Sequence, residues 1–323
     1  MDLSTFLNLL SLIGALALLL VTGFLCRRLG IMDDVASKRF SKLIITVGQP
    51  MMIVAALIGK EFSPALFKEG LLYMGLGFLL HPVLALFALL TGPIYRDPGQ
   101  RKISQFATIF TNCGFIGLPI LNAVFPGKGA FIGAFFLIGF HVYVWTLGIV
   151  ILGQGREDIK LTPRKALLNY GTVPCAIGLG LYVLQAVVPI PAPIVTFTDS
   201  LGDLCMPISV LITGGLMATL PLKRVFTNLR LYMFNVLKLI AIPLAVCLLA
   251  KLATLGLPRE SAYPLVLFCT VVSALPSAAT VTMLAELYDL DAPYAAQTVG
   301  STSLLSIGTL PLLYVLGDLI ARI

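Results

Sequence analysis

The chain has 323 residues, of which 58% are hydrophobic and only 11% carry a charge. Soluble globular domains are about 45–50% apolar and about 25% charged, so the composition excludes an ordinary soluble protein and predicts an all-α integral membrane protein. The net charge of +7 does not require a nucleic-acid partner, because most of it lies in loops where membrane topology places basic residues.

Apolar windows of roughly 19 residues predict about ten membrane spans. The first span is expected to be retained rather than cleaved as a signal peptide, because it has no basic start and its apolar run exceeds the about 7–15 residues of a signal peptide core. In chain order the predicted spans are 3–25, 38–59, 66–90, 102–126, 128–153, 165–188, 194–220, 222–252, 262–288 and 293–321.

Basic residues are dense in alternate loops. With the N-terminus outside, the inward loops hold 15 lysines and arginines and the outward side holds 6, while Lys238 falls inside a span. The positive-inside rule therefore predicts a multi-pass protein of the cell (inner) membrane with both termini on the outer, periplasmic side.

A short charged loop at 154–164 divides the predicted spans into two groups of five. Because five is odd, the groups must have opposite orientations, which predicts an inverted repeat of residues 1–153 and 165–323. Three weak matches fall in the same ordinal span of each half: Gln49-Pro50 with Met206-Pro207, His81-Pro82 with Ile242-Pro243, and Thr111-Asn112 with Pro276-Ser277.

Two predicted spans, the fourth and the ninth, are interrupted near their middles by polar, helix-breaking runs. These are Thr111-Asn112-Cys113-Gly114 and Ser273-Ala274-Leu275-Pro276-Ser277. Unwound backbone in hydrocarbon leaves amides and carbonyls without partners, so it persists only where protein buries it or where it lines a watery cavity. A pair of such breaks is typical of the substrate site of a secondary transporter.

The two breaks should create an anion site. The second half-helices are predicted to start near Cys113-Gly114 and near Ser277-Ala278, where free amides and a partial charge of about +0.5 face each other. A carboxylate suits that arrangement. The Ser277 hydroxyl can also cap its half-helix. The residues predicted to bind substrate are Asn112, Cys113, Gly114, Pro276, Ser277, Ala278, Thr280 and, from the second span, Gln49.

Helix packing is the alternative explanation, since small residues and amides commonly join membrane helices. The occurrence of a break in the same ordinal span of both halves favours a site. A polar run in the tenth span is also denser than packing requires, and part of it is expected to face the breaks. That run consists of Gln297, Thr298, Ser301, Thr302, Ser303 and Ser306.

Lys238 is predicted to lie near the bilayer centre if its span begins around Leu229. An unpaired lysine there costs about 2.5–3.5 kcal/mol, so it should have a partner. The hypothesis is that its ammonium lies near the carbonyl ends of the first half-helices, around Ser273 or Ile109-Phe110, in a coupling or charge-compensating role. The alternative is a span that begins at Leu222, from which the side chain reaches the inner interface.

Two further residues are candidates for coupling. His141 could relay a proton, although a lone histidine among aromatic residues is more often a packed, hydrogen-bonded side chain. Asp203, one turn after Asp199, is expected to mark a hydrated start of the seventh span, with ion or proton coupling as the alternative. Six cysteines without a CxxC pair and only two histidines predict no metal site and no disulfide framework, and no cofactor is expected.

Around the breaks the chain resembles a known family. Asn112-Cys113-Gly114-Phe115-Ile116-Gly117-Leu118-Pro119 is similar to a signature of the auxin efflux carriers, and Ser273-Ala274-Leu275-Pro276-Ser277 resembles their second signature. The resemblance implies a fold like that of bile-acid/sodium symporters and sodium/proton antiporters. Spans 1, 2, 6 and 7 would form a scaffold, spans 3–5 and 8–10 a mobile domain, and the protein a homodimer through the scaffold.

Bacterial relatives with short loops are associated with malonate or malate, and plant members with indole-3-acetate. The plant carriers tend to have proline before the crossing asparagine, where this chain has Thr111.

The predicted function is therefore secondary or facilitative transport of a small organic anion by elevator-type alternating access, with the lipid bilayer as its environment. The chain has no P-loop, no GxSxG and no HExxH motif, so an ATP-driven pump and an embedded hydrolase are not expected. A passive anion channel or a membrane sensor of the same fold is the alternative. Coupling to protons, to sodium or to neither stays open.

Overall fold

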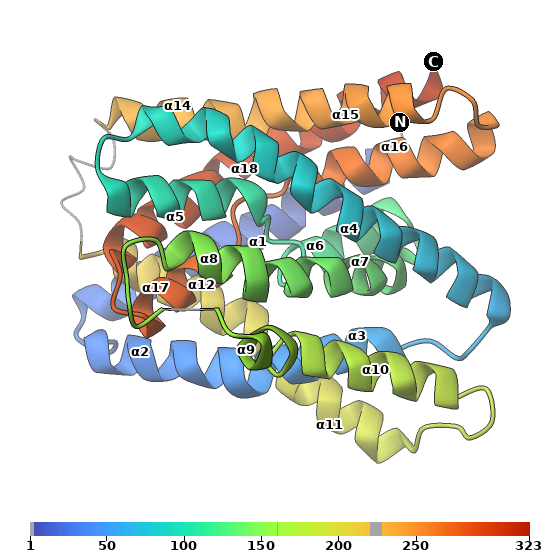
Figure 1. Cartoon of the computed structure of the whole chain (residues 1–323), viewed down its shortest axis with the longest axis horizontal. Helices are drawn as coiled ribbons and strands as arrows, with labels where there is room; N and C mark the ends of the chain where they lie inside the picture. Colours follow the sequence, from blue (N-terminus) through green and yellow to red (C-terminus); the bar gives the residue numbers. More distant parts are fainter. Residues whose placement is uncertain (1–2, 160, 220–227) are drawn as a thin grey trace.

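The computed structural model describes residues 3–159, 161–219 and 228–323. In these ranges the regular structure is helical, apart from one isolated bridge between two residues. Most helices run along one common direction, and the two chain termini lie at the same end of the molecule (Figure 1). We call this end the terminal end. The opposite end carries the chain at 29–33, 92–97, 153–159 and 228–231, and we call it the basic end because several arginines stand in or beside these segments in the sequence.

The first half of the chain begins with α1 (Leu3–Arg28) and a long helix made of α2 (Asp34–Leu43), η1 (Ile44–Gly48) and α3 (Gln49–Ile58). The following helices are α4 (Pro64–Thr91), η2 (Gly92–Ile94), α5 (Pro98–Ile109), α6 (Gly117–Val124), α7 (Gly129–Tyr143), η3 (Val144–Gly148) and α8 (Ile149–Leu152).

The second half begins with α9 (Pro163–Leu167), which is a short helix, and α10 (Thr172–Leu184). The following helices are α11 (Ala192–Gly202), α12 (Cys205–Met217), α14 (Leu229–Val236), η4 (Leu237–Ala241), α15 (Ile242–Ala253), α16 (Arg259–Ala274), α17 (Ala279–Leu287) and α18 (Ala292–Arg322).

Seven helical stretches in the described chain are long and apolar enough to cross a membrane. This confirms the predicted all-α, multi-pass membrane class. The helix α10 is apolar but shorter, and the predicted spans 4 and 9 are divided into the short pairs α5/α6 and α16/α17. Ten complete crossings therefore stay a prediction. The alternative start of the eighth span at Leu222 lies outside the described residues.

Two of the long helices contain a single wide π-turn that is followed by a proline at the second position of the next segment. These are η1 before Gln49-Pro50 and η4 before Ile242-Pro243. Proline lacks an N–H and its ring displaces the carbonyl four residues earlier, so the chain inserts an extra residue there. Such π-turns are frequent at functional sites, and these two contain or adjoin Lys238 and Gln49.

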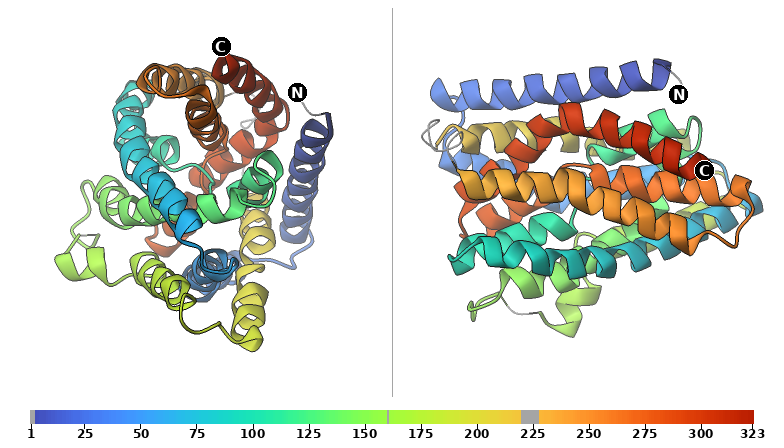
Figure 2. Two further views of the ribbon diagram at one scale, coloured as in Figure 1. Left: turned by 90° about the vertical axis from the view of Figure 1, so that its right-hand side faces the viewer. Right: turned by 90° about the horizontal axis from the view of Figure 1, so that it is seen from above.

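Small residues allow close packing of several helix pairs, among them α1 with α12 and α4 with α7. A Cβ on Gly214 would lie 2.1 Å from the Leu20 carbonyl oxygen, where α12 meets α1, and a Cβ on Gly77 would lie 2.5 Å from the Phe136 carbonyl oxygen, where α4 meets α7. Backbones this close are typical of membrane helix pairs. Figure 2 shows the helices end-on, with α1 at the periphery and the interrupted helices inside the bundle.

Candidate functional site

Both interrupted helices stop because their backbone turns extended near mid-helix. The helix α5 ends at Ile109, and Phe110 has φ −100° and ψ 103°. The helix α16 ends at Ala274, and Leu275 has φ −60° and ψ 149°, a conformation that the following Pro276 favours. Since α6 resumes at Gly117 and α17 at Ala279, each break is several residues long.

The two breaks pair with each other through their backbones. The Asn112 amide donates to the Pro276 carbonyl at 2.8 Å, and the Ala278 amide donates to the Phe110 carbonyl at 2.9 Å. An isolated antiparallel bridge joins Thr111 to Ser277 between these bonds. This pairing satisfies backbone groups that would be costly to leave unpaired inside a membrane, and it fixes the two breaks as one unit.

A polar side chain of α18 supports the second break. The Ser277 amide donates to the Thr302 hydroxyl at 3.2 Å, while that hydroxyl lies 2.9 Å from the Thr298 carbonyl. Thr302 is therefore the member of the predicted polar run that reaches the breaks. Another member, Ser301, instead lies 3.2 Å from the side-chain oxygen of Asn235.

Two details of the predicted anion site are wrong. The second half-helix of the first break starts at Gly117 and not near Cys113-Gly114, because residues 113–116 form a turn that the Gly117 amide closes by donating to the Asn112 carbonyl at 2.8 Å. Ser277 does not cap α17, because the residue at the cap is Ala278 and no side chain bonds the helix start.

The backbone pairing also changes which amides could hold an anion. The amides of Asn112, Ser277 and Ala278 are occupied, and the Cys113 amide donates to the Thr111 carbonyl. In the described chain, the backbone bonds outside helices leave the Gly114 and Phe115 amides without a carbonyl partner. The amides of Ala279 and Thr280 at the start of α17 have no carbonyl partner among the backbone bonds outside helices in the described residues, whereas the Val281 amide donates to the Ala278 carbonyl at 3.1 Å. Thr280 is buried.

Two of the predicted binding residues have buried polar atoms without a partner. Both amide atoms of Gln49, which is 1% exposed, and the hydroxyl of Ser277 bond to no group of the described chain. Most buried polar groups in proteins are hydrogen-bonded, so each exception is a group able to bind a ligand or water. Thr282 of α17 and Ser37 and Ser41 of α2 share this property, and α2 packs against α17.

Lys238 is the most deeply buried charged side chain near the breaks, at 0% exposed. Its ammonium donates to the Ser273 carbonyl at 3.3 Å, at the last turn of α16. The expected placement near a carbonyl end is thus confirmed, and the alternative that the side chain reaches the interface is wrong. A cation suits this position, because carbonyls at a helix C-terminus carry a partial negative charge.

His141 is buried in α7, next to the ring of Phe140 and close to Gly171, the residue before α10. Neither ring nitrogen bonds to the described chain, so the expectation of a hydrogen-bonded histidine is wrong. Its proposed proton relay is not tested by this geometry.

A cavity of about 280 Å³ opens on the terminal side of the breaks. We call this cavity the vestibule. Its lining includes Met52, Lys60, Leu118 and Asp203. Asp203 therefore lies in the vestibule and not at the breaks. A Cβ on Gly114 would lie 3.2 Å from the methyl group of Met52. Met52 therefore lies between the vestibule and the turn that contains Gly114.

A second cavity, of about 670 Å³, lies at the basic end between α1 and α2 on one side and α17 and α18 on the other. Its lining includes Arg27, Lys38, Arg39 and Glu286. The Lys38 ammonium lies 2.6 Å from the Asp289 carboxylate and joins the two sides. Asp289 has φ 51°, a left-handed conformation that is uncommon for a residue other than glycine.

The loop between the two halves also contacts this region. Arg156 donates to the carbonyls of Tyr288 and Asp289 and to the Asp158 carboxylate. The guanidinium holds the pKa of Asp158 down at about 2, so this exposed pair stays ionised at neutral pH. The loop between the two halves therefore binds the residues that follow the C-terminus of α17 at the basic end.

Sequence reasoning missed several residues of the site. Met52 and Lys60 carry no motif, and the unpartnered hydroxyls of Ser37, Ser41 and Thr282 look like ordinary small residues of apolar helices. One signal was available: Ser37 and Ser41 are four residues apart, which places them on one helical face.

The comparisons with known proteins agree with this architecture. The family model described as "Membrane transport protein" matches residues 11–169 and 160–314, which together cover most of the chain. None of the curated proteins compared with the chain matches it. The chain therefore belongs to the membrane transport protein family, that of the auxin efflux carriers, whose members are transporters rather than enzymes.

Proposed function

We propose that the protein is a carrier of a small carboxylate, which it binds where the two breaks meet. The observation that carries this proposal is the joined pair of breaks, with amides at Gly114 and Phe115 that bond no carbonyl of the described chain and unpartnered side chains at Gln49 and Ser277. Amides and an amide side chain can bind a carboxylate. Phe115 and Ile116 lie in the turn of the first break and Leu118 lies at the start of α6. These apolar residues favour a monocarboxylate or small dicarboxylate such as malonate or malate over a phosphate or sugar.

We propose that transport proceeds by an elevator-type movement. The scaffold would consist of α1, α2–α3, α10 and α11–α12, and the mobile part of the remaining long helices, with the two halves as an inverted repeat. The grouping of contacts supports this division: α1 packs on α12 and α3 on α10 and α11, while α4 packs on α7 and α16 on α18. A homodimer through the scaffold belongs to the same proposal.

Lys238 would compensate the charge of the bound carboxylate. Its position at the carbonyl end of α16 is supported by the bond to Ser273. This is where sodium-coupled relatives would hold a cation, so a covalently fixed ammonium could replace that ion. Proton coupling and uniport both fit a fixed charge at this position.

A flux experiment separates a carrier from the alternative of a passive channel. In liposomes preloaded with unlabelled malonate, the carrier should take up labelled malonate faster than in empty liposomes, and its flux should saturate. Malate, lactate and indole-3-acetate as external competitors would rank the substrates. Flux that rises in proportion to concentration and ignores the internal anion would contradict the proposal.

The buried serines of α2, Ser37 and Ser41, predict the route by which substrate leaves at the basic end. When the mobile part moves, α17 should separate from α2 and expose Ser41 to water, and breaking the Lys38–Asp289 pair should favour that state. Exposed ion pairs contribute about 0.2–1 kcal/mol, so Lys38→Gln should speed thiol labelling of Ser41→Cys up to about fivefold.

The neighbouring change Arg39→Gln serves as the control for a lost positive charge, and the parent protein gives the background from its native cysteines. Equal labelling in Lys38→Gln and Arg39→Gln would show that the pair does not restrain this interface.

A further inference from the structure

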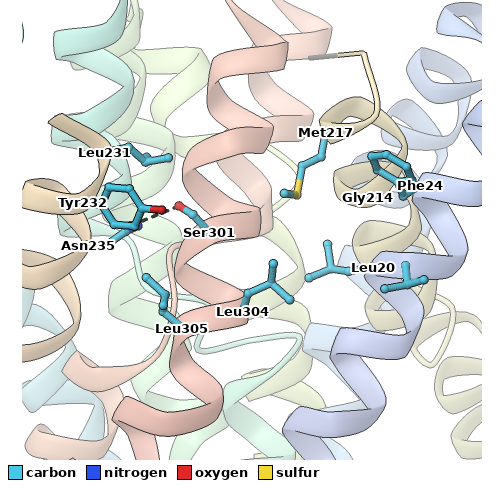
Figure 3. A pocket seen from close by; sticks show the side chains of 11 residues that line it. Leu20, Phe24, Gly214, Met217, Leu231, Tyr232, Asn235, Ser301, Leu304 and Leu305 are labelled. Carbon is cyan, nitrogen blue, oxygen red and sulfur yellow. Dashed lines mark hydrogen bonds between the residues drawn. The ribbon is translucent and has the colours of Figure 1, made fainter. Parts of the chain in front are cut away.

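A third cavity has properties opposite to those of the substrate site. It encloses about 290 Å³ between α1, α12, α14 and α18, and its walls are almost entirely apolar. Figure 3 shows Leu231 and Tyr232 on one side, Leu20 and Phe24 on the other, and Ser301 and Leu304 between them. We call it the lateral groove.

The lateral groove opens toward the surroundings of the bundle. Several of its lining side chains are strongly exposed, among them Val21, Tyr232, Leu304 and Leu305. These residues lie in helices that are apolar enough to cross a membrane, so hydrocarbon lies against them in a bilayer. If the groove were empty, its lining side chains would lose dispersion contacts. In a bilayer, the acyl chain of a lipid is the molecule available to fill it.

A small carboxylate does not fit this groove. Its central polar groups, Ser301 and Asn235, already bond to each other at 3.2 Å, and Asn235 is only 3% exposed. An anion inside would lose its hydration against apolar walls without gaining donors. The groove is therefore distinct in chemistry from the breaks.

Positive charge flanks the groove at the basic end. Arg28 is exposed, and its guanidinium lies over the Phe24 ring, 5.4 Å from the centroid. Arg28 follows Phe24, which lines the groove, by four residues, and this places Arg28 about 6 Å further along the helix. On the other side, the exposed Arg230 directly precedes Leu231 near the start of α14. A phosphate suits two guanidinium groups at the end of an apolar groove.

We propose that the lateral groove binds an anionic glycerophospholipid, with one acyl chain between α1 and α14 and the phosphate beside Arg28 and Arg230. An acyl chain gains no hydrophobic free energy on leaving a bilayer that is equally apolar. Selectivity therefore comes from the two arginines, while the groove fixes the chain by close packing. The site does not depend on which substrate the breaks hold.

Native mass spectrometry of the purified protein tests the charge requirement. With phosphatidylglycerol and phosphatidylcholine supplied in equal amounts, we expect the parent to retain the anionic lipid at least about tenfold more. The double change Arg28→Gln/Arg230→Gln should bring that ratio close to one. The matched control Arg39→Gln/Lys42→Gln removes two exposed charges from α2 at the same end and should leave the ratio unchanged.

Filling the groove tests the place of binding. Leu304→Trp should abolish retention of both lipids, whereas Leu312→Trp, on another exposed turn of α18, should not. A parent ratio near one, equal loss in the two double variants, or equal retention in the two tryptophan variants would each overturn the proposal. If Leu304→Trp does not fold, the comparison of the two double variants still decides.

Discussion

Replacing Lys238 by methionine should abolish carboxylate transport and yet stabilise the folded protein. The lysine is completely buried, and its one described hydrogen bond is to the Ser273 carbonyl. Exchanging buried charge for an apolar side chain of similar volume is often neutral or stabilising by about 1–4 kcal/mol. Loss of the ammonium near the breaks should reduce transport at least about 100-fold, which corresponds to about 2.8 kcal/mol.

Thermal unfolding and counterflow of the same preparation measure both effects. The variant is expected to gain stability and to lose transport. A lysine needed only for folding would change stability without abolishing transport. Lys251→Met, at the end of α15 and partly exposed, is the matched control and should change neither quantity appreciably. Normal flux in folded Lys238→Met would remove Lys238 from the mechanism.

Changing Asn112 to alanine should weaken carboxylate binding about tenfold to 100-fold without unfolding the protein. The backbone of Asn112 makes the structural contacts, since its amide bonds Pro276 and its carbonyl accepts from Gly117. Alanine preserves both. The side chain is then free to bind substrate, and a hydrogen bond to a charged group contributes about 1.5–3 kcal/mol.

Isothermal titration with malonate measures this effect, with two comparisons. Asn112→Asp has the same shape but places a carboxylate against the substrate, so it should bind more weakly than the alanine variant. Asn235→Ala removes another asparagine that is equally buried, at 3% exposed, and should bind like the parent. Equal affinity in Asn112→Ala and the parent would contradict the assignment of Asn112.

The breaks could be predicted from sequence because helix-breaking residues act locally. Pro276 and the run from Asn112 to Gly114 disfavour helix inside apolar spans, although Pro82 and Pro311 lie inside continuous helices. Lys238 was equally readable, since a buried lysine requires a nearby acceptor. The start of α6 at Gly117 could not be predicted. The turn before it is closed by the hydrogen bond from the Gly117 amide to the Asn112 carbonyl, and the sequence does not show that this bond forms.

Apart from the approach of Lys238 to Ser273, contacts between distant segments could not be predicted. The pairing of Thr111 with Ser277 joins residues far apart in the chain, so it depends on how the helices pack and not on either segment alone. The same holds for Met52 beneath the vestibule and for the lateral groove, whose walls come from four helices. Leucines and methionines that line a cavity have the same sequence pattern as those that fill a core.

A structure of the protein with saturating malonate tests the central claim most directly. The account predicts density for one anion between the turn at Gly114-Phe115 and the first turn of α17, within hydrogen-bonding distance of Asn112. Anion density confined to the vestibule beside Lys60, with the breaks still closed by their own backbone pairing and no anion there, would contradict it.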